Sequence, residues 1–348
     1  MAEISLRQAF ASPPVAYRPC PLFVFNDEHE GEAGEARITG MLEGYAEVGF
    51  GGAFLHPRPG LMTEYLSPRW FELIRHSIKE CARLGLRAHL YDENSYPSGV
   101  GGGHVPAAVP EARTRYVGAV FGRGSESVPA GALAVHHLRD GLPEEESENE
   151  ICPGGEWVAF TMGSMEPVAW HGETACPSLL DPRTAEAFLK TTYEAYRREL
   201  GDLWEAVPSV FTDEPHLPAE GHGPWSPGLH LTPYVLGQFR QRKGYDLRPH
   251  LMSVFYDVGD YRRARFDLYD LMHELWVENW ALPMERWCEE HEVALTGHYL
   301  EHDWPCPYAT PGHVHMLAHM QWPGTDMLET FLLKGHDFHD IQNLQRGS

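Results

Sequence analysis

The chain has 348 residues, of which 43% are hydrophobic and 10 are tryptophan, and its net charge is −23 at pH 7. This length suffices for one large domain or two, and the composition is that of a packed globule. The negative charge argues against a nucleic acid or an anionic membrane as partner, because both would be repelled. A neutral or cationic ligand is therefore expected.

The predicted location follows from what the sequence lacks. No run of 18 apolar residues occurs, so no membrane span is predicted. The start, MAEISLRQAF, has neither the basic region nor the apolar core of a secretion signal. The six cysteines are widely spaced without a CxxC pair, which in so long a chain is typical of reduced thiols. We expect a cytoplasmic protein, and an extracytoplasmic one only if a leader is missing from this start.

The first hundred residues alternate between predicted strands and helices. Apolar runs at 21–27 and 51–56 and a third beginning at residue 86 predict buried strands. Apolar positions at helical spacing predict helices over 35–50 and 67–86. The second helix has Ser67 as N-cap, Pro68 at its first position and Gly85 as its stop. Repeated strand–helix–strand units of this length predict parallel strands.

The pattern changes between residues 114 and 172. Short apolar runs at 115–122, 132–138 and 156–163 predict strands, and an acidic stretch at 142–150 predicts a solvated loop. We interpret 114–172 as a β-rich insertion after the third strand. The first barrel units then occupy 1–113 and the remaining units 173–348, all within one catalytic domain.

Strand–helix alternation resumes after residue 173. We predict helices over 181–204 and 260–291, strands over 207–216 and 292–303, and a weak sixth strand over 324–329. Residues 217–258 read as a long loop with short helical pieces. The predicted class is an α/β fold resembling a (β/α)₈ TIM barrel. Because eight strands are not found, either the chain is a fragment or the barrel is incomplete at its C-terminus.

Polar side chains follow the predicted strands at the point where each strand ends. They are His56 and Arg58 after the second strand, Tyr91, Asp92 and Glu93 after the third, Asp213 and Glu214 after the fourth, and His298, Glu301, His302 and Asp303 in the fifth. In a parallel barrel all these ends lie on one face, where active sites form. We therefore expect these side chains around one pocket.

The stretch SVFTDEPHL, residues 209–217, ends a predicted strand on two acids and a proline. Pro215 favours an extended conformation in the residue before it, which we expect to hold Glu214 out from the strand end. Glycoside hydrolysis needs two carboxyl groups, one as proton donor and one as nucleophile or base. Glu214 is the predicted donor.

Tryptophans are expected beside this donor. Trp225, Trp304 and Trp322 fall in predicted loops after strand ends. Apolar walls of this kind raise the pKa of a buried carboxyl group, and aromatic faces suit the C–H faces of sugars. Ordinary packing is the alternative interpretation for each of the three.

Structural interpretations compete with the functional ones for several other residues. For Asp92 and Glu93 the alternative to substrate contact is a scaffold role, in which they are hydrogen-bonded to the glycine-rich loop at 97–104. The glycines of this loop permit a sharp turn and close ligand approach. Arg58 is as well explained by a buried ion pair, and Glu214 by a pair with an arginine. The loop matches neither nucleotide-binding pattern, GxGxxG or GxxxxGK[ST].

Metal-binding patterns are weaker. His315 and His319 lie four residues apart, and the tail contains HDFHD, but HExxH is absent. One alternative is a metal-dependent hydrolase using His56, His298, His302 and Asp303. Calcium on the strand-end carboxylates is another candidate.

Five blocks in order, FLHPRPG, LYDENSYPSGVGGGHV, FTDEPH, LTGHYLEHD and MQWPGTDML, resemble the catalytic barrel of large bacterial and fungal glycoside hydrolases. The group they resemble is the α-L-rhamnosidase family 106 and its relatives, over roughly residues 20–330. The resemblance implies a (β/α)₈ catalytic domain acting on plant or bacterial polysaccharides, with calcium used by some members. Carried over, Glu214 matches the proton donor after strand four and Glu301 an acid after strand five.

The resemblance also implies a substrate pocket. His56, Arg58, Asp92 and Glu93 match pocket positions, and the expected substrate-binding set is completed by Tyr91, Asp213, His298 and Trp304. Family members continue into further strands and β-sandwich domains, so missing C-terminal domains are expected here. The predicted function is a glycoside hydrolase, with a non-catalytic carbohydrate-binding barrel as a further alternative.

Overall fold

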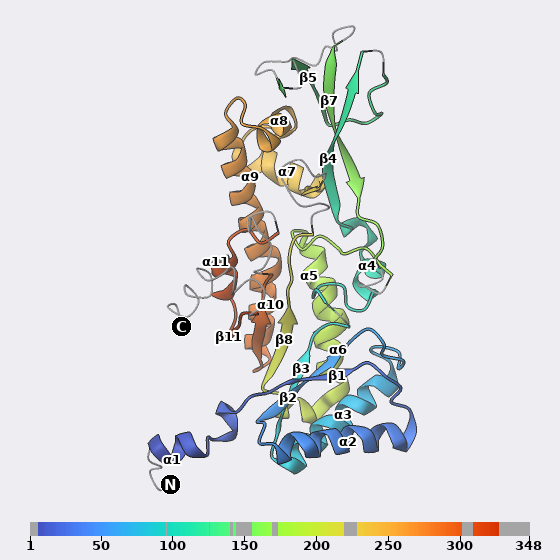
Figure 1. The fold of residues 1–348 in the computed structure, drawn as a ribbon, viewed down its shortest axis with the longest axis vertical. Helices are drawn as coiled ribbons and strands as arrows, with labels where there is room; N and C mark the ends of the chain where they lie inside the picture. Colours follow the sequence, from blue (N-terminus) through green and yellow to red (C-terminus); the bar gives the residue numbers. More distant parts are fainter. Residues whose placement is uncertain are drawn as a thin grey trace.

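The computed structural model describes residues 6–94, 96–124, 126–139, 142–143, 155–168, 173–218, 228–300 and 309–326. The strands are β1 Leu22–Phe25, β2 Gly52–Pro57, β3 Arg87–Tyr91, β4 Arg115–Arg123, β5 Ala134–Arg139, β6 Leu142–Pro143, β7 Glu156–Ser164, β8 Ser209–Asp213, β9 Leu229–His230, β10 Ala294–His298 and β11 Trp322–Pro323. The α-helices are α1 Leu6–Ala11, α2 Gly31–Glu47, α3 Pro68–Leu84, α4 His104–Ala108, α5 Pro182–Phe188, α6 Glu194–Leu200, α7 Pro233–Lys243, α8 Leu251–Phe255, α9 Tyr261–Trp276, α10 Leu282–Glu290 and α11 His313–Leu317. The strands form two sheets, one below the other in the view of Figure 1.

The larger sheet is parallel and has the order β1-β2-β3-β8-β10-β11. Val24 lies opposite His56, Leu90 opposite Val210, and Asp213 opposite His298. Because neighbours run in the same direction, their carboxyl ends share one edge, as the strand-end pattern predicts. In the described residues this sheet has six strands rather than the eight of a (β/α)₈ barrel. The fold is therefore a mixed α/β structure with a parallel sheet, and closure into a barrel is not shown.

The two faces of this sheet differ because side chains alternate along each strand. Phe25 points to the helices and meets Trp70 of α3 at a ring-centroid distance of 5.2 Å. On the other face, Phe211 of β8 contacts Phe54 and stacks on Tyr91 at 5.3 Å and 5.6 Å between centroids. This second face, which we call the inner face, is aromatic and leads to the polar strand ends.

The helix signals in the sequence are largely confirmed. The Ser67 side chain accepts a hydrogen bond from the backbone N–H of Trp70, and Gly85 ends α3 with a φ of 71°. The Asp181 side chain likewise caps α5. The helices expected over 181–204 and 260–291 are present, each interrupted by a π-helical turn, at Leu189–Tyr193 and Val277–Ala281.

Two expectations for this part of the chain need correction. Residues 217–258 were expected as a long loop with short helical pieces. Helical pieces are present, but one of them, α7, is an eleven-residue helix, in which only Val235 and Phe239 are buried. The sixth strand is β11, which pairs with β10 before the segment expected at 324–329. Of that segment, residues 324–326 follow the strand, and 327–329 lie outside the described residues.

The second sheet is antiparallel, with the order β6-β5-β7-β4-β9. Strand β4 pairs with β7 from Arg115 opposite Ser164 to Arg123 opposite Glu156. The sheet lies at the top of Figure 1 beside α7 and α8, and Phe160 stacks on Phe255 of α8 at 5.2 Å between centroids. Strands β4, β5 and β7 lie where 115–122, 132–138 and 156–163 were expected, while β9 comes from beyond residue 172. Strand β6 occupies the first two residues of the stretch expected as a loop at 142–150, and residues 144–150 lie outside the described residues. The division into barrel units and an insertion stays a prediction.

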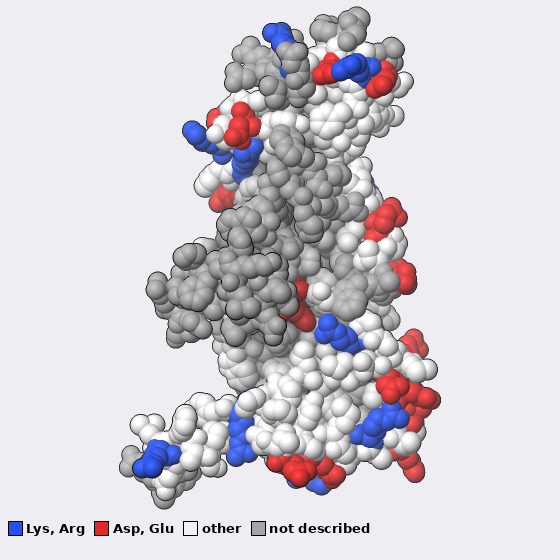
Figure 2. All heavy atoms as spheres, in the orientation of Figure 1, with Lys and Arg blue, Asp and Glu red and all other residues white. Residues whose placement is uncertain are grey.

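The described surface carries mixed charge. On the face shown in Figure 2, positive and negative side chains lie side by side over the lower right of the molecule. Arg69 pairs with Glu35 at 2.9 Å and Arg83 with Glu43 at 2.8 Å, which ties α3 to α2. Within the described ranges, no helix combines the length and apolarity needed to cross a membrane.

Candidate functional site

A pocket of about 610 Å³ opens at the carboxyl edge of the parallel sheet. Its apolar wall is the inner face, with Leu22, Phe54 and Phe211. Its charged and aromatic polar residues are Arg58, Tyr96, Asp213, Glu214, His298 and Asp326, and Thr296 and Thr325 also line it. The structure therefore brings four of the predicted site residues, Arg58, Asp213, Glu214 and His298, to one cavity.

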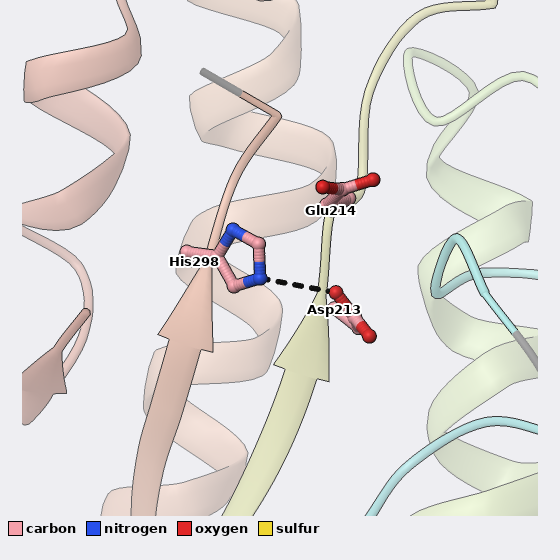
Figure 3. Close-up of side chains that lie close together, drawn as sticks. All are labelled: Asp213, Glu214 and His298. Carbon is pink, nitrogen blue, oxygen red and sulfur yellow. Dashed lines mark ion pairs between the residues drawn. The ribbon is translucent and has the colours of Figure 1, made fainter. Parts of the chain in front are cut away.

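Asp213 and His298 form an ion pair across neighbouring strands (Figure 3). The Nε2 atom of His298 donates to Oδ1 of Asp213 at 3.0 Å, and the hydroxyl of Tyr91 donates a short hydrogen bond to Oδ2. Burial alone would raise the pKa of Asp213, but the hydrogen bond and charge of His298, with the hydrogen bond from Tyr91, hold that pKa below its usual value. Asp213 is thus a carboxylate with both oxygens engaged.

Glu214 has an unusual backbone conformation. Its φ is +47°, in the left-handed region, so the extended conformation expected from Pro215 is wrong. Two hydrogen bonds hold the backbone there: Glu214 N–H donates to the carbonyl of His298 at 3.1 Å, and the carbonyl of Glu214 accepts from Nδ1 of His216 at 2.7 Å. Such strain costs about 1–3 kcal/mol and is commonly kept at functional sites. It turns the Glu214 side chain to the pocket wall beside Asp213 and His298.

Gly297 permits the close approach of β10 and β8. Its φ is +114°, and a Cβ atom at this position would lie 1.9 Å from the carbonyl oxygen of Thr212. Only glycine fits both conditions. The position matters because His298 is the next residue and Asp213 follows Thr212.

Asp92 lies beneath the pocket in a buried hydrogen-bond network. It accepts from the hydroxyls of Ser98 at 2.6 Å and Tyr193 at 2.8 Å. The Ser98 hydroxyl also accepts from the backbone N–H of Asp213 at 2.8 Å. Burial raises the pKa of Asp92 to about 8, against the effect of these hydroxyl donors. The residue supports Asp213 from below and does not line the pocket.

Glu93 is enclosed by the glycine-rich loop. Its carboxylate accepts from the backbone N–H groups of Asn94, Gly99, Val100, Gly101 and Gly102 at 2.6–3.2 Å. Burial raises its pKa to about 7, against the effect of these donors. The loop thus binds an internal carboxylate instead of a ligand. Substrate contact by Glu93 is not supported by this geometry, because the side chain is 1% exposed and its acceptors are in use.

His56 and Arg58 act as a pair at the other side of the pocket. Nη1 of Arg58 donates to Nε2 of His56 at 3.1 Å, and the guanidinium lies over the Tyr96 ring at 5.8 Å. Burial, with the charge of Arg58, lowers the pKa of His56 to about 4, so its imidazole is neutral. His56 is fully buried and Tyr91 lies against it, so of the expected substrate contacts here only Arg58 reaches the cavity.

The remaining expected site residues either lie outside the described residues or do not line the pocket. Glu301, His302, Asp303, Trp304 and Trp225 lie outside the described residues. Trp322 is a residue of β11 and not of a loop, and its ring lies near Arg87 at the start of β3, away from the pocket mouth.

Three functional candidates were missed. Asp326 and Tyr96 line the pocket, and Ser98 joins Asp92 to the backbone of Asp213. An acid two or three residues after a strand was a usable signal for Asp326. It was missed because 324–329 was taken for the strand itself.

A calcium ion does not fit the described donor set. The group that can share an ion is Asp213, Glu214 and His298, with ligand atoms within 4.8 Å of one another. Calcium takes six to eight oxygen ligands, whereas this group, in the described part of the chain, includes an imidazole.

An acid-lined pocket at the carboxyl edge of a parallel sheet is the place where α/β enzymes build their active sites. The fold is similar to "Structure of Rhamnosidase from Novosphingobium sp. PP1Y", with a TM-score of 0.54 and 13% identity over 91% of this chain. The chain spans about half of that structure, 49% of its length. This likeness shows a glycoside hydrolase-like fold. No protein-family model matches the chain, and no curated protein matches it.

Proposed function

We propose that the chain is a glycoside hydrolase, of a rhamnosidase-like kind, in which Glu214 is the general acid. The observation that supports this most is the position of Glu214 after β8, turned by a left-handed backbone to the wall of a sugar-sized pocket. The fold shared with a rhamnosidase adds to it. The substrate is an oligo- or polysaccharide, for which Phe54 and Phe211 offer apolar surface.

In the proposed reaction, the Glu214 carboxyl donates its proton to the leaving glycosidic oxygen. Asp213 is an unsuitable nucleophile because His298 and Tyr91 occupy its two oxygens. The second carboxylate is Glu301 or the pocket residue Asp326. Arg58, the cation of the described pocket wall, hydrogen-bonds sugar hydroxyls.

The test compares two aryl glycosides of the same sugar, 4-nitrophenyl and phenyl α-L-rhamnoside. Glu214→Gln is expected to lower kcat/KM by roughly 10²–10⁴-fold on the phenyl substrate. The loss on the 4-nitrophenyl substrate is smaller, because that leaving group needs less protonation. The exposed Glu186→Gln serves as control and keeps the wild-type rates. The melting temperature is expected to stay unchanged in both variants. Equal turnover by Glu214→Gln and the wild type contradicts the proposal.

A sugar-binding role without turnover is the second candidate. It is favoured by the engagement of both oxygens of Asp213, which removes one of the pocket carboxylates from catalysis. Calorimetric binding of oligosaccharides, with no product after days of incubation, identifies this role.

A further inference from the structure

The cluster of Asp213, Glu214 and His298 has a use beyond acid catalysis. We propose that these three side chains bind a divalent transition-metal ion such as Zn²⁺, and that the bound ion excludes the acid role of Glu214. The metal binding is inferred from the geometry of the cluster alone, whereas its effect on the acid role of Glu214 rests on the proposed function.

The spacing of the cluster suits such an ion. Each residue offers one ligand atom, and the three atoms lie within 4.8 Å of one another. Nε2 of His298 and Oδ1 of Asp213 are 3.0 Å apart. The ion would take the place of the proton between these two atoms, and that proton is released to water. Two ligand atoms with bonds of about 2.1 Å at a tetrahedral angle lie about 3.4 Å apart, so the pair needs to separate by only a few tenths of an ångström. Rotation about the side-chain bonds of Glu214 brings in the third ligand, since one of its carboxylate oxygens already lies within 4.8 Å of the other two ligand atoms. Figure 3 shows the three side chains close together at the ends of the two strands.

The backbone holds two of the ligands in place before any ion binds. Asp213 and His298 are directly opposite one another on parallel strands, and Gly297 lets the strands approach closely. Their separation is therefore set by the sheet rather than by flexible loops.

A second layer of hydrogen bonds orients the Asp213 carboxylate. The Tyr91 hydroxyl donates to Oδ2 of Asp213, which leaves Oδ1 directed at His298. The Ser98 hydroxyl accepts a hydrogen bond from the backbone N–H of Asp213 at 2.8 Å. Protein metal sites use this arrangement to fix a carboxylate ligand and raise its affinity. It is independent of the ligand cluster itself.

The donor set selects the class of ion. An imidazole with two carboxylates suits zinc and similar first-row metals, whereas calcium and magnesium prefer oxygen ligands alone. Three protein ligands at the wall of an open pocket leave coordination positions for water or a solute. The net charge of −23, and Asp326 in the same pocket, favour a cation at this place.

The consequence for activity is inhibition. A carboxylate oxygen of Glu214 that coordinates a metal ion cannot carry the proton for a leaving group. Added Zn²⁺ is therefore expected to slow any glycoside cleavage that depends on Glu214, and a chelator to restore it.

The experiment titrates chelator-treated full-length chain with Zn²⁺ by calorimetry and with Co²⁺ by visible absorption. The wild type is expected to bind one ion of each metal per chain more tightly than its surface histidines do. His298→Ala and Asp213→Asn are expected to lose this site, with affinity at least tenfold lower, and Tyr91→Phe to weaken it by roughly 10-fold. His315→Ala, which breaks the surface pair of His315 with His273, is the matched control and keeps the site.

Any one of three results overturns the inference. The wild type binds Zn²⁺ and Co²⁺ no more tightly than the His298→Ala variant does, or Asp213→Asn keeps the wild-type affinity. The third is that the wild type binds Ca²⁺ more tightly than Zn²⁺ at this site. Where His298→Ala fails to fold, His298→Gln preserves the volume of the side chain and is judged by the same titration. A chain without glycosidase activity that still binds Zn²⁺ through these residues upholds this inference and contradicts only the proposed function.

Discussion

Glu93 illustrates at the residue scale how an acidic side chain can be structural although the sequence places it at a predicted active edge. Its two oxygens collect five backbone N–H groups from residues that follow it within nine positions. Left-handed glycines, such as Gly101 and Gly102 with φ of 60°, turn these groups inward. The loop shaped in this way presents Ser98 to Asp92 and Asp213.

Replacing Glu93 with glutamine tests this role. The amide nitrogen of Glu93→Gln places a donor against backbone donors, so we expect the free energy of unfolding to fall by about 1–3 kcal/mol. Urea denaturation followed by circular dichroism measures the change. Glu186→Gln on the exposed face of α5 is the control with no change. Equal stability of the Glu93→Gln variant and the wild type rules the structural role out.

At the scale of elements, the pairing of β8 with β10 decides the site. Asp213 and Glu214 end one strand and His298 ends the other, so the cluster exists only while the register of Asp213 opposite His298 holds. Gly297 is the residue on which this close pairing depends, because the carbonyl of Thr212 occupies the place of a side chain.

Gly297→Ala is expected to destabilise the protein by roughly 1–3 kcal/mol, from the positive φ and the contact with Thr212. To make room for the added Cβ atom, β10 must move away from β8, which separates His298 from Asp213. The proposed glycosidase activity is therefore expected to fall further than the loss of stability alone explains. Gly40→Ala is the matched control: no atom lies within 4 Å of the added Cβ on α2, and helix propensity makes this variant more stable by about 0.5–1 kcal/mol. Thermal melts and rates of both variants check the prediction, which is wrong if both are stabilised.

At the scale of the whole molecule, buried titratable groups predict a stability maximum near neutral pH. Burial lowers the pKa of His56 and His230 to about 4 and that of His89 to about 3. Between about pH 4 and 6.5 the unfolded chain therefore binds protons that the folded chain does not, and stability rises with pH. Asp92 and Glu93, with pKa raised to about 8 and 7, act in the opposite sense up to about pH 8, because the folded chain keeps protons that the unfolded chain has lost.

Above about pH 6.5 only Asp92 and Glu93 still make the stability depend on pH. The free energy of unfolding is therefore expected to be highest near pH 6.5 and to fall toward pH 8. Urea titrations at about pH 5, 6.5 and 8 measure the curve. In Asp92→Asn the fall above pH 6.5 becomes shallower, because asparagine does not titrate. A fall as steep as that of the wild type contradicts the assignment to Asp92.

The local parts of the fold were predictable because their causes are local. The start and stop of α3 depend on Ser67, Pro68 and Gly85, which act on their own backbone neighbours. Only short helical pieces were predicted where helix α7 lies, because this helix buries only two apolar side chains, too few to show a helical period. Strand β11 was predicted at the wrong residues because its two residues are in a strand only through their pairing with β10. The Gln321 side chain, just before β11, also accepts a hydrogen bond from the Leu295 N–H of β10 at 2.8 Å.

By itself, the sequence determined the alternation of strands and helices, the parallel direction of the strands, and the acids at their carboxyl ends, because spacing, capping and chain direction are local properties. Only the tertiary structure decided which acids face the pocket and which are buried supports. That choice depends on partners far along the chain: Tyr91 reaches Asp213 across 122 residues, and Ser98 across 115. Such contacts leave no periodic trace in the sequence, because they arise only when the strands are packed side by side.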